Sequence, residues 1–308
     1  MSSEGHDLVV PLITDPAAPG MRSTRSRVAS YFALTKPRII ELLLITTVPS
    51  MVLAAGGWPG TWLVAATLIG GSLSAGGANA LNNYVDRDID QIMRRTRARP
   101  LARHEVTPSN ALVFGVILGI AGFAWLWATT NLLAAVISTA ALLFYVFVYT
   151  VSLKRTSSQN IVIGGAAGAA PALVGWAAVA GSLALPAWVL FVVVFYWTPP
   201  HFWALAIRYK DDYERAGVPM LPVVAGVGAT TRKMLLYTGL MVAVSLLLVP
   251  VARMRWTYLV AAIILGAWFL WDTWRVYRRP DEAMRLFTTS TVYLSALFAS
   301  VLLDVILR

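Results

Sequence analysis

The chain has 308 residues, of which 58% are hydrophobic and 13% are charged, and its formal net charge is +10. A soluble globular domain carries about 25% charged residues, so this composition excludes an ordinary soluble enzyme. No cysteine is present, which excludes disulfides, thiolate metal sites and a cysteine nucleophile.

Residues 1–30 are polar and lack the apolar core of a secretory signal. We expect a disordered cytoplasmic arm here, followed by a single domain over residues 31–308. Arg22, Arg25 and Arg27 alternate with Ser and Thr, which is also the pattern of a transit peptide. A basic anchor in front of the first membrane segment is the interpretation that we favour.

Nine apolar segments, each about as long as a bilayer crossing requires, follow the arm. They run over residues 39–57, 61–82, 110–128, 132–151, 160–180, 186–207, 234–252, 256–274 and 287–307. The segments predict an all-α membrane protein, a bundle of nine transmembrane helices around a central cavity that is open towards the cytoplasmic side.

The basic residues fall almost entirely on one side of these segments. Of the 25 Lys and Arg residues, all except Arg253, Arg255 and Arg308 lie in the N-terminal arm and in every second connection. The positive-inside rule therefore predicts a cytoplasmic N-terminus and an external C-terminus. The short arm favours a bacterial plasma membrane over a mitochondrion. The net charge then reflects topology, and we expect no nucleic-acid partner.

The most informative motif lies at the cytoplasmic end of the second segment. Asn82, Asp86 and Asp90 are four residues apart, a spacing that stacks them on one face of a helix. Two carboxylates and an amide oxygen suit Mg²⁺. Arg95 and Arg99 follow and are placed to hold phosphates that the cation bridges. The cluster predicts a diphosphate site; a solvated loop with internal ion pairs is the alternative.

Two further polar groups lie on the same side of the membrane. Arg208, Lys210, Asp211 and Asp212 follow the sixth segment, and Lys154 and Arg155 follow the fourth. The acidic group either faces the first cluster across a cavity or caps a helix at the interface. The pair after the fourth segment, taken alone, is more typical of a topological anchor.

His201 follows Pro199 and Pro200 inside the sixth segment. The prolines should kink the helix and free backbone carbonyls. An ionisable ring inside a membrane segment is a candidate site residue. A hydrogen-bonded structural histidine is the alternative.

With these residues in view, the chain resembles the UbiA-type intramembrane prenyltransferases, whose hallmark Asn-x-x-x-Asp-x-x-x-Asp follows the second helix. Within that superfamily it resembles the protoheme IX farnesyltransferase (haem O synthase) branch, at residues 34–38, 86–90, 159–176 and 200–222. The chain departs from the superfamily pattern in one place. Many members carry Asp-x-x-x-Asp after the sixth helix, whereas here Arg215 stands four residues after Asp211.

The resemblance implies transfer of farnesyl from farnesyl diphosphate to a vinyl group of protoheme IX, with addition of water. Haem would be a substrate, and Mg²⁺ the cofactor. The implied metal ligands are Asn82, Asp86, Asp90, Asp211 and Asp212, and the implied diphosphate contacts are Arg95, Arg99, Lys154, Arg155 and Lys210. Candidate haem contacts are His201, Arg208 and Arg38. Haem A synthase or oxidase assembly factors are expected protein partners.

Two other classes of function share part of this pattern. A prenyltransferase that makes a quinone precursor would use the same first cluster. A transporter of haem or organic anions would also have many membrane segments and buried polar groups. It would not need a magnesium-type triad beside a row of arginines.

Overall fold

The computed structural model describes residues 26–308, apart from the side chains of residues 39 and 41–44. The predicted disordered arm lies outside the described residues up to residue 25, and its last residues belong to the helix Arg27–Leu34. All the elements of the described part of the chain are helices. The long ones are α2 (Pro37–Ala55), α3 (Thr61–Val85), α5 (Pro108–Thr129), α6 (Leu132–Leu143) with its π-helical continuation η1 (Phe144–Leu153), α7 (Asn160–Ala180), α8 (Leu185–Arg208), α11 (Gly226–Ala252), α12 (Trp256–Arg278) and α13 (Ala283–Ile306).

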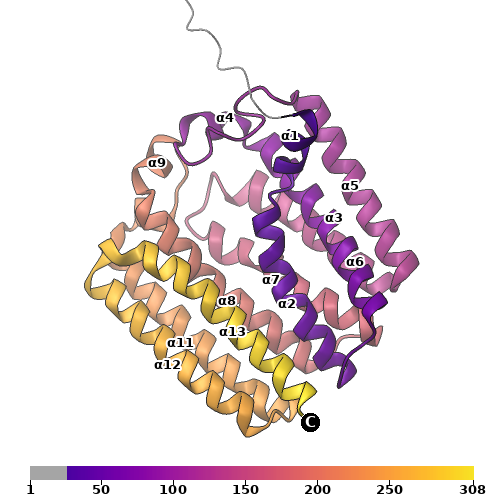
Figure 1. Ribbon diagram of the computed structural model, residues 1–308. Helices are drawn as coiled ribbons and strands as arrows, with labels where there is room; N and C mark the ends of the chain where they lie inside the picture. The colour runs from indigo at the N-terminus through magenta and orange to yellow at the C-terminus, as the bar shows by residue number, and fades with distance from the viewer. Residues whose placement is uncertain (1–25) are drawn as a thin grey trace, which may run out of the picture.

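Short helices join the long ones. They are α1 (Arg27–Leu34), α4 (Arg87–Ile92), α9 (Lys210–Arg215), α10 (Leu221–Val224) and the 3₁₀ turn η2 (Pro280–Glu282). In Figure 1, α1, α4 and α9 lie at one end of the bundle and the C-terminus lies at the other.

Eight helices within the described residues are long and apolar enough to cross a membrane. They coincide with eight of the predicted segments, although α11 begins at Gly226 rather than at residue 234. The all-helical membrane fold is therefore confirmed. The remaining segment, 39–57, coincides with α2, whose 19 residues span about 28 Å at 1.5 Å per residue. The total of nine crossings stays a prediction, because the described apolar part of α2 is Ile45–Ala55.

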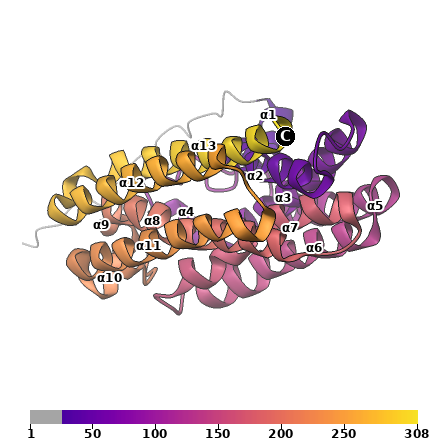
Figure 2. The same cartoon turned by 90° about the horizontal axis from the view of Figure 1, so that it is seen from below.

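The long helices close into a ring (Figures 1 and 2). Along one side α3 packs on α5, α5 on α6 and α6 on α7; along the other α8 packs on α11, α11 on α12 and α12 on α13. Contacts of α7 with α8, of α13 with α2 and of α2 with α3 complete the circle. Contacts of α2 with α7 and of α8 with α13 cross the ring, and the interior space is lined mainly by α2, α3, α6, η1, α7 and α8.

Helices α3 and α5 pack closely against each other. A Cβ atom on Gly77 would lie 2.8 Å from the carbonyl oxygen of Gly115 and from the amide nitrogen of Gly119. Small residues permit such an approach between membrane helices. The pair therefore fixes α3, which carries the Asn82 motif at its end.

Candidate active site

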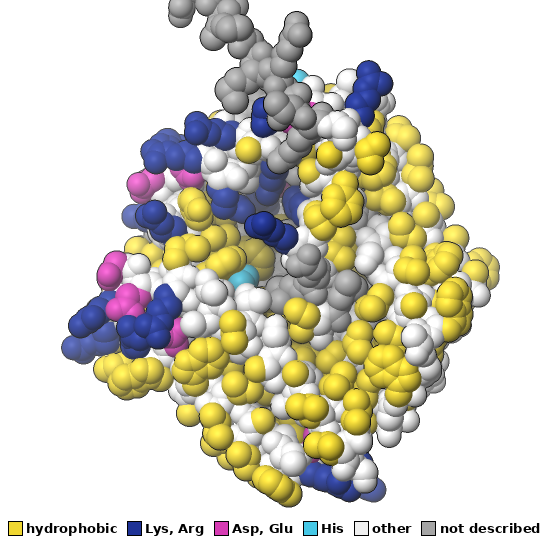
Figure 3. All heavy atoms as spheres, viewed as in Figure 1, with side chains coloured by type: hydrophobic (Ala, Val, Ile, Leu, Met, Phe, Trp, Pro, Cys, Tyr) yellow, Lys and Arg dark blue, Asp and Glu magenta, His cyan; other side chains and the backbone are white. Residues whose placement is uncertain are grey.

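A cavity of about 270 Å³ lies inside the ring. The end nearest α4 and α9 is polar, and the space-filling view shows Lys and Arg side chains around a hollow there (Figure 3). The polar lining consists of Lys36, Asn79, Asn82, Asp90, Arg95, Thr96, Arg99 and Lys154. The rest is largely small or apolar and includes Gly71, Ala75, Leu142, Gly168, Pro171, Val194 and Leu294. The cavity therefore has a charged mouth and an apolar interior.

The Asn82 motif does not lie on one continuous helix, as its spacing had predicted. Helix α3 ends at Val85, and Asp86 joins it to α4. The four-residue spacing survives the break, because the amide of Asp86 donates to the carbonyl of Asn82 and the amide of Asp90 to that of Asp86, both at 2.9 Å. All three side chains are buried.

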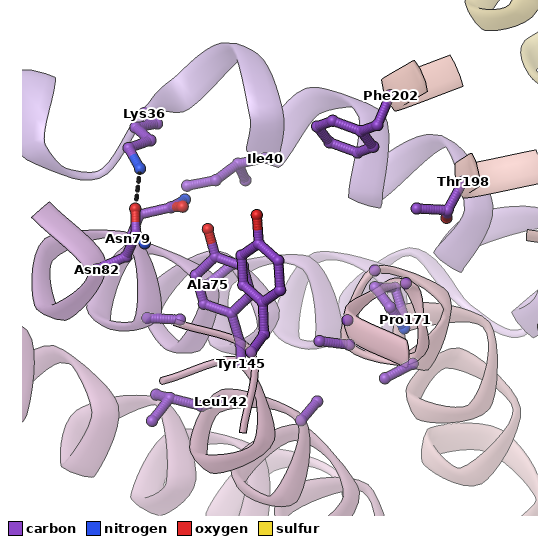
Figure 4. Close-up of a pocket in the computed structure, with 18 of the residues that line it drawn as sticks. Lys36, Ile40, Ala75, Asn79, Asn82, Leu142, Tyr145, Pro171, Thr198 and Phe202 are labelled. Atoms are coloured by element: carbon purple, nitrogen blue, oxygen red, sulfur yellow. Dashed lines mark hydrogen bonds between the residues drawn. The ribbon is translucent and has the colours of Figure 1, made fainter. Parts of the chain in front are cut away.

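Four side chains, three of which line the cavity, form a hydrogen-bonded chain. Lys36 Nζ donates to Asn82 Oδ1 at 2.6 Å (Figure 4). Asn82 Nδ2 donates to Asp86 Oδ2 at 2.7 Å, and Lys154 Nζ donates to that same oxygen. Asp86 Oδ1 is buried and has no hydrogen-bond partner, and Nη2 of Arg155 is 4.0 Å from it. This oxygen is thus an unpaired acceptor in a buried position, although Asp86 itself is not among the residues that line the cavity.

Lys36 reaches the cavity from an unusual backbone position. It precedes α2 with φ of 52°, in the left-handed region that non-glycine residues seldom occupy. Asn79 Nδ2 and Asn83 Nδ2 on α3 donate to the carbonyls of Thr35 and Leu34, at 2.9 and 3.0 Å. These bonds hold the segment before α2 against α3 and direct the lysine inward.

Arg99 and Arg95, which follow α4, bind different partners. Arg99 Nη1 donates to both carboxylate oxygens of Asp90 at 2.8 Å. Arg95 Nη2 instead donates to the hydroxyl of Tyr213 at 3.3 Å, and its guanidinium lies 6.0 Å from the ring centre of Tyr209. Both arginines line the cavity, and their role as diphosphate contacts stays a prediction.

The mouth of the cavity has an excess of positive charge. Burial lowers the pKa of Lys36 well below its usual value, and the charge of Arg99 adds to this effect. Burial also lowers the pKa of Lys154, whereas the carboxylate of Asp86 acts in the opposite direction. Buried cations that repel one another favour an anionic ligand.

Arg155 points to a different partner. Its guanidinium donates to Asp88 at 2.6 and 2.7 Å, and this bond lowers the pKa of Asp88 to about 2. Arg155 is not among the cavity-lining residues. It ties the end of η1 to α4 beside the site.

The second acidic group lies on α9. Asp212 is buried, accepts a hydrogen bond from Arg215 Nη2, and has Arg94 Nε at 3.7 Å. Asp211 and Arg208 are exposed, and Lys210 is half-buried; none of the three lines the cavity. Within the described residues, no three or more His, Asp or Glu side chains gather as a metal site. Asp211 and Asp212 therefore do not join Asp86 and Asp90 in one cluster.

His201 is enclosed by aromatic rings on α8 and α13. Its ring stacks between Trp197 and Phe287, with both centroid distances 4.3 Å, and Nδ1 hydrogen-bonds to Ser290 Oγ at 2.7 Å. It does not line the cavity. This is the environment of the structural histidine given as the alternative. Arg38, the remaining candidate haem contact, is exposed.

Several cavity residues were absent from the predicted site. They are Lys36, Thr96, Tyr145, Tyr149 and Tyr213. Lys36 could have been predicted as a site residue, because it is a basic residue directly before Pro37. Tyr145 and Tyr149 stack at 5.3 Å on η1, but an aromatic pair in an apolar segment is too common to mark a site.

The residues present fit a magnesium ion. Asn82, Asp86 and Asp90 supply only oxygen donors, which are the ligands that this hard cation takes. Oδ1 of Asp86 is a buried oxygen without a hydrogen-bond partner, so it has a free lone pair for a cation.

Comparison with known proteins decides the family. Residues 43–299 match the UbiA prenyltransferase family. The chain belongs to that family. Protoheme IX farnesyltransferase 2 of Saccharopolyspora erythraea is 51% identical over 302 residues, which cover 96% of this chain and 93% of the relative. Protoheme IX farnesyltransferase of Parafrankia sp. is 56% identical over 279 residues, 89% of each chain.

Solved structures show the same fold for this UbiA family member. A structure described as giving insights into digeranylgeranylglyceryl phosphate synthase in membranes has a TM-score of 0.76 at 17% identity, covering 92% of this chain and 99% of that one. A UbiA homolog from Archaeoglobus fulgidus, bound to DMAPP and Mg²⁺, has a TM-score of 0.65 at 15% identity, covering 88% and 99%. The predicted resemblance is confirmed, and the chain is a multi-pass integral membrane protein.

Proposed function

We propose that the chain transfers farnesyl from farnesyl diphosphate to a vinyl group of protoheme IX and, with addition of water, forms haem O and diphosphate. Relatives above 50% identity over most of the chain carry the name protoheme IX farnesyltransferase. The observation that carries the proposal is the cavity, which places Asn82, Asp90, Arg99 and Lys154 at the mouth of an apolar interior. Such a cavity suits a diphosphate attached to a hydrocarbon.

Asn82, Asp86 and Asp90 are the proposed magnesium ligands. When bound, Mg²⁺ neutralises the diphosphate and stabilises it as a leaving group. Support comes from the buried unpaired oxygen of Asp86. It also comes from the UbiA homolog that was solved with DMAPP and Mg²⁺.

The cations of the mouth bind the diphosphate oxygens directly. Lys36, Arg95, Arg99 and Lys154 all line the cavity, and their N–H groups donate charge-assisted hydrogen bonds to phosphate. Arg99 is already hydrogen-bonded to Asp90. It would therefore hold the metal ligand and the leaving group together. Arg155, engaged by Asp88, acts by holding α4 in place.

The apolar part of the cavity takes the farnesyl chain and excludes water from the reacting carbon. The allylic C–O bond breaks, its electron pair leaves with the diphosphate, and the vinyl π electrons form the new C–C bond. Water then adds to the resulting cation on the haem substituent and loses a proton. Tyr145 lies between Asn82 and Pro171 in Figure 4, and Tyr149 also lines the cavity. Their π faces stabilise positive charge there.

The proposed orientation has the cavity mouth and the N-terminus in the cytoplasm of a bacterium. It rests on the distribution of Lys and Arg. Arg38 and Arg208, which are exposed, remain the proposed partners of the haem propionates. Asp211, Asp212 and Lys210 on α9 would then border the haem entrance rather than the metal. The product would be passed to haem A synthase or to oxidase assembly factors.

The test is a defined reaction of the purified protein. Protoheme IX and farnesyl diphosphate are incubated with Mg²⁺, and the extracted haem is analysed by mass spectrometry. We expect a species heavier by one farnesyl group and one hydroxyl group, together with released diphosphate. Farnesylation of 4-hydroxybenzoate but not of protoheme would instead identify a quinone-precursor enzyme. Movement of unmodified haem across a vesicle membrane would identify a transporter.

A further inference from the structure

Thr150 is a fully buried residue of η1 that contacts the metal-binding motif but does not line the cavity. Its hydroxyl oxygen accepts a hydrogen bond from Asn82 Nδ2 at 3.1 Å. The same hydroxyl donates to the carbonyl of Tyr145 at 2.8 Å. Thr150 thus connects the π-helical segment to the side chain at the end of α3.

These two bonds determine which way the amide of Asn82 faces. A threonine hydroxyl has one hydrogen, and here the Tyr145 carbonyl takes it. Only lone pairs remain toward Asn82, so the NH₂ end of the amide must meet them. Asp86 Oδ2 accepts the other amide hydrogen at 2.7 Å. With both N–H bonds engaged, Oδ1 faces the cavity, where Lys36 Nζ contacts it at 2.6 Å.

The π-helical backbone makes this arrangement possible. In an α-helix a threonine hydroxyl bonds to a carbonyl three or four residues earlier. In η1 the hydroxyls of Thr150 and Ser152 each bond five residues back, to the carbonyls of Tyr145 and Phe147. Isolated π-helical turns are rare and concentrate at functional sites. The wider turn directs a lone pair of Thr150 at the amide.

We propose that Thr150 is a positioning residue that presents the oxygen of Asn82 to the divalent cation. The inference rests on the proposed function, because it takes Asn82 as a metal ligand. Partners that orient metal ligands typically change metal affinity 10- to 100-fold when they are removed. We expect an effect of that size from the loss of this one hydroxyl.

The experiment compares Thr150→Val, which keeps the shape and removes the hydroxyl, with Thr150→Ser, which keeps the hydroxyl. Mn²⁺ serves as the probe and is titrated by electron paramagnetic resonance into the purified full-length protein. Farnesyl thiodiphosphate, a poorly reactive analogue, is bound throughout. We expect the Val variant to bind Mn²⁺ about 10- to 100-fold more weakly and the Ser variant to bind it like wild type. The KM for protoheme at saturating Mg²⁺ should not change.

Ser152→Ala is the matched control, because Ser152 makes the same five-residue bond but is exposed and has no bond to Asn82. It should bind Mn²⁺ normally. If the Val variant does not fold, Thr150→Ala is compared with Thr150→Ser in the same way. Unchanged Mn²⁺ affinity in the Val or Ala variant, or equal weakening in the Ser variant, overturns the inference. Absence of Mn²⁺ binding in wild type overturns the proposed metal site itself, and the two failures are therefore distinguishable.

Discussion

Two glycines on α7 provide a matched pair for testing whether the cavity holds the substrate. Gly164 and Gly168 are about one helical turn apart, and both line the cavity. A Cβ atom on Gly164 would lie 2.9 Å from Cγ and 3.1 Å from Cε2 of the Tyr149 ring. A Cβ atom on Gly168 would meet nothing within 4 Å. Packing therefore requires a glycine at the first position and not at the second.

The two alanine variants should change the stability of the protein in opposite directions. Gly168→Ala gains helix propensity, about 0.5–1 kcal/mol, without any new contact. Gly164→Ala has the same gain but must displace Tyr149, and overpacking of this kind costs about 1–3 kcal/mol. We expect the melting temperature to rise slightly for Gly168→Ala and to fall for Gly164→Ala. Thermal unfolding of both variants in one detergent measures the difference.

Gly168→Leu carries the functional part of the prediction. Its side chain would extend into open cavity space and occupy volume that the farnesyl chain or the haem needs. The variant should fold as well as wild type, and its kcat/KM should fall at least about tenfold, which corresponds to 1.4 kcal/mol of lost binding. Steady-state kinetics with farnesyl diphosphate measures this. A fully active Gly168→Leu enzyme, or a stabilised Gly164→Ala enzyme, would refute the reasoning.

Other variants test single contacts. Asp86→Asn should keep the fold and lose at least about 100-fold in Mg²⁺-dependent turnover; turnover within a factor of two of wild type would exclude Asp86 as a ligand. Lys154→Met should destabilise the protein by about 3–5 kcal/mol, because it removes the cation that is hydrogen-bonded to the buried Asp86 carboxylate. Arg155→Met removes a partly exposed pair with Asp88 worth at most about 1 kcal/mol; equal melting temperatures would contradict this. His201→Phe should cost about 1–3 kcal/mol of stability through its lost hydrogen bond and leave the KM for protoheme unchanged; a raised KM would restore His201 as a haem contact.

The membrane helices and the first cluster were predictable from local pattern. Hydropathy over about 20 residues locates a crossing because a bilayer imposes its length. The Asn82 motif survives the break at Asp86 because the backbone bonds of one helical turn continue through it. Position along the chain was sufficient for the spacing of the three residues, and their binding of a metal stays a prediction.

The partners of the charged residues were not predictable. Lys36 enters the cavity because Asn79 and Asn83 hold the preceding backbone against α3. Asp212 has Arg94 at 3.7 Å because the loop after α4 lies beside α9. Both are contacts between segments that are distant in the sequence, and no spacing rule reports them.

The π-helical register of η1 was equally hidden. Phe144–Leu153 has the hydropathy of an ordinary membrane helix. The wider turn is visible only in its hydrogen bonds, such as that from Thr150 to the carbonyl of Tyr145. The sequence therefore showed which residue types carry the chemistry, but not the residue that orients Asn82.

The central claim is that Asn82, Asp86 and Asp90 together bind the divalent ion that in turn binds the diphosphate. The most direct measurement is the anomalous scattering of Mn²⁺ in crystals of the protein with farnesyl thiodiphosphate bound. The account predicts one ion within coordination distance of Asn82 Oδ1 and of an oxygen from each carboxylate, with the diphosphate on its cavity side. A Mn²⁺ ion bound elsewhere, with Arg99 still on both oxygens of Asp90 and Lys154 still on Asp86, would contradict it.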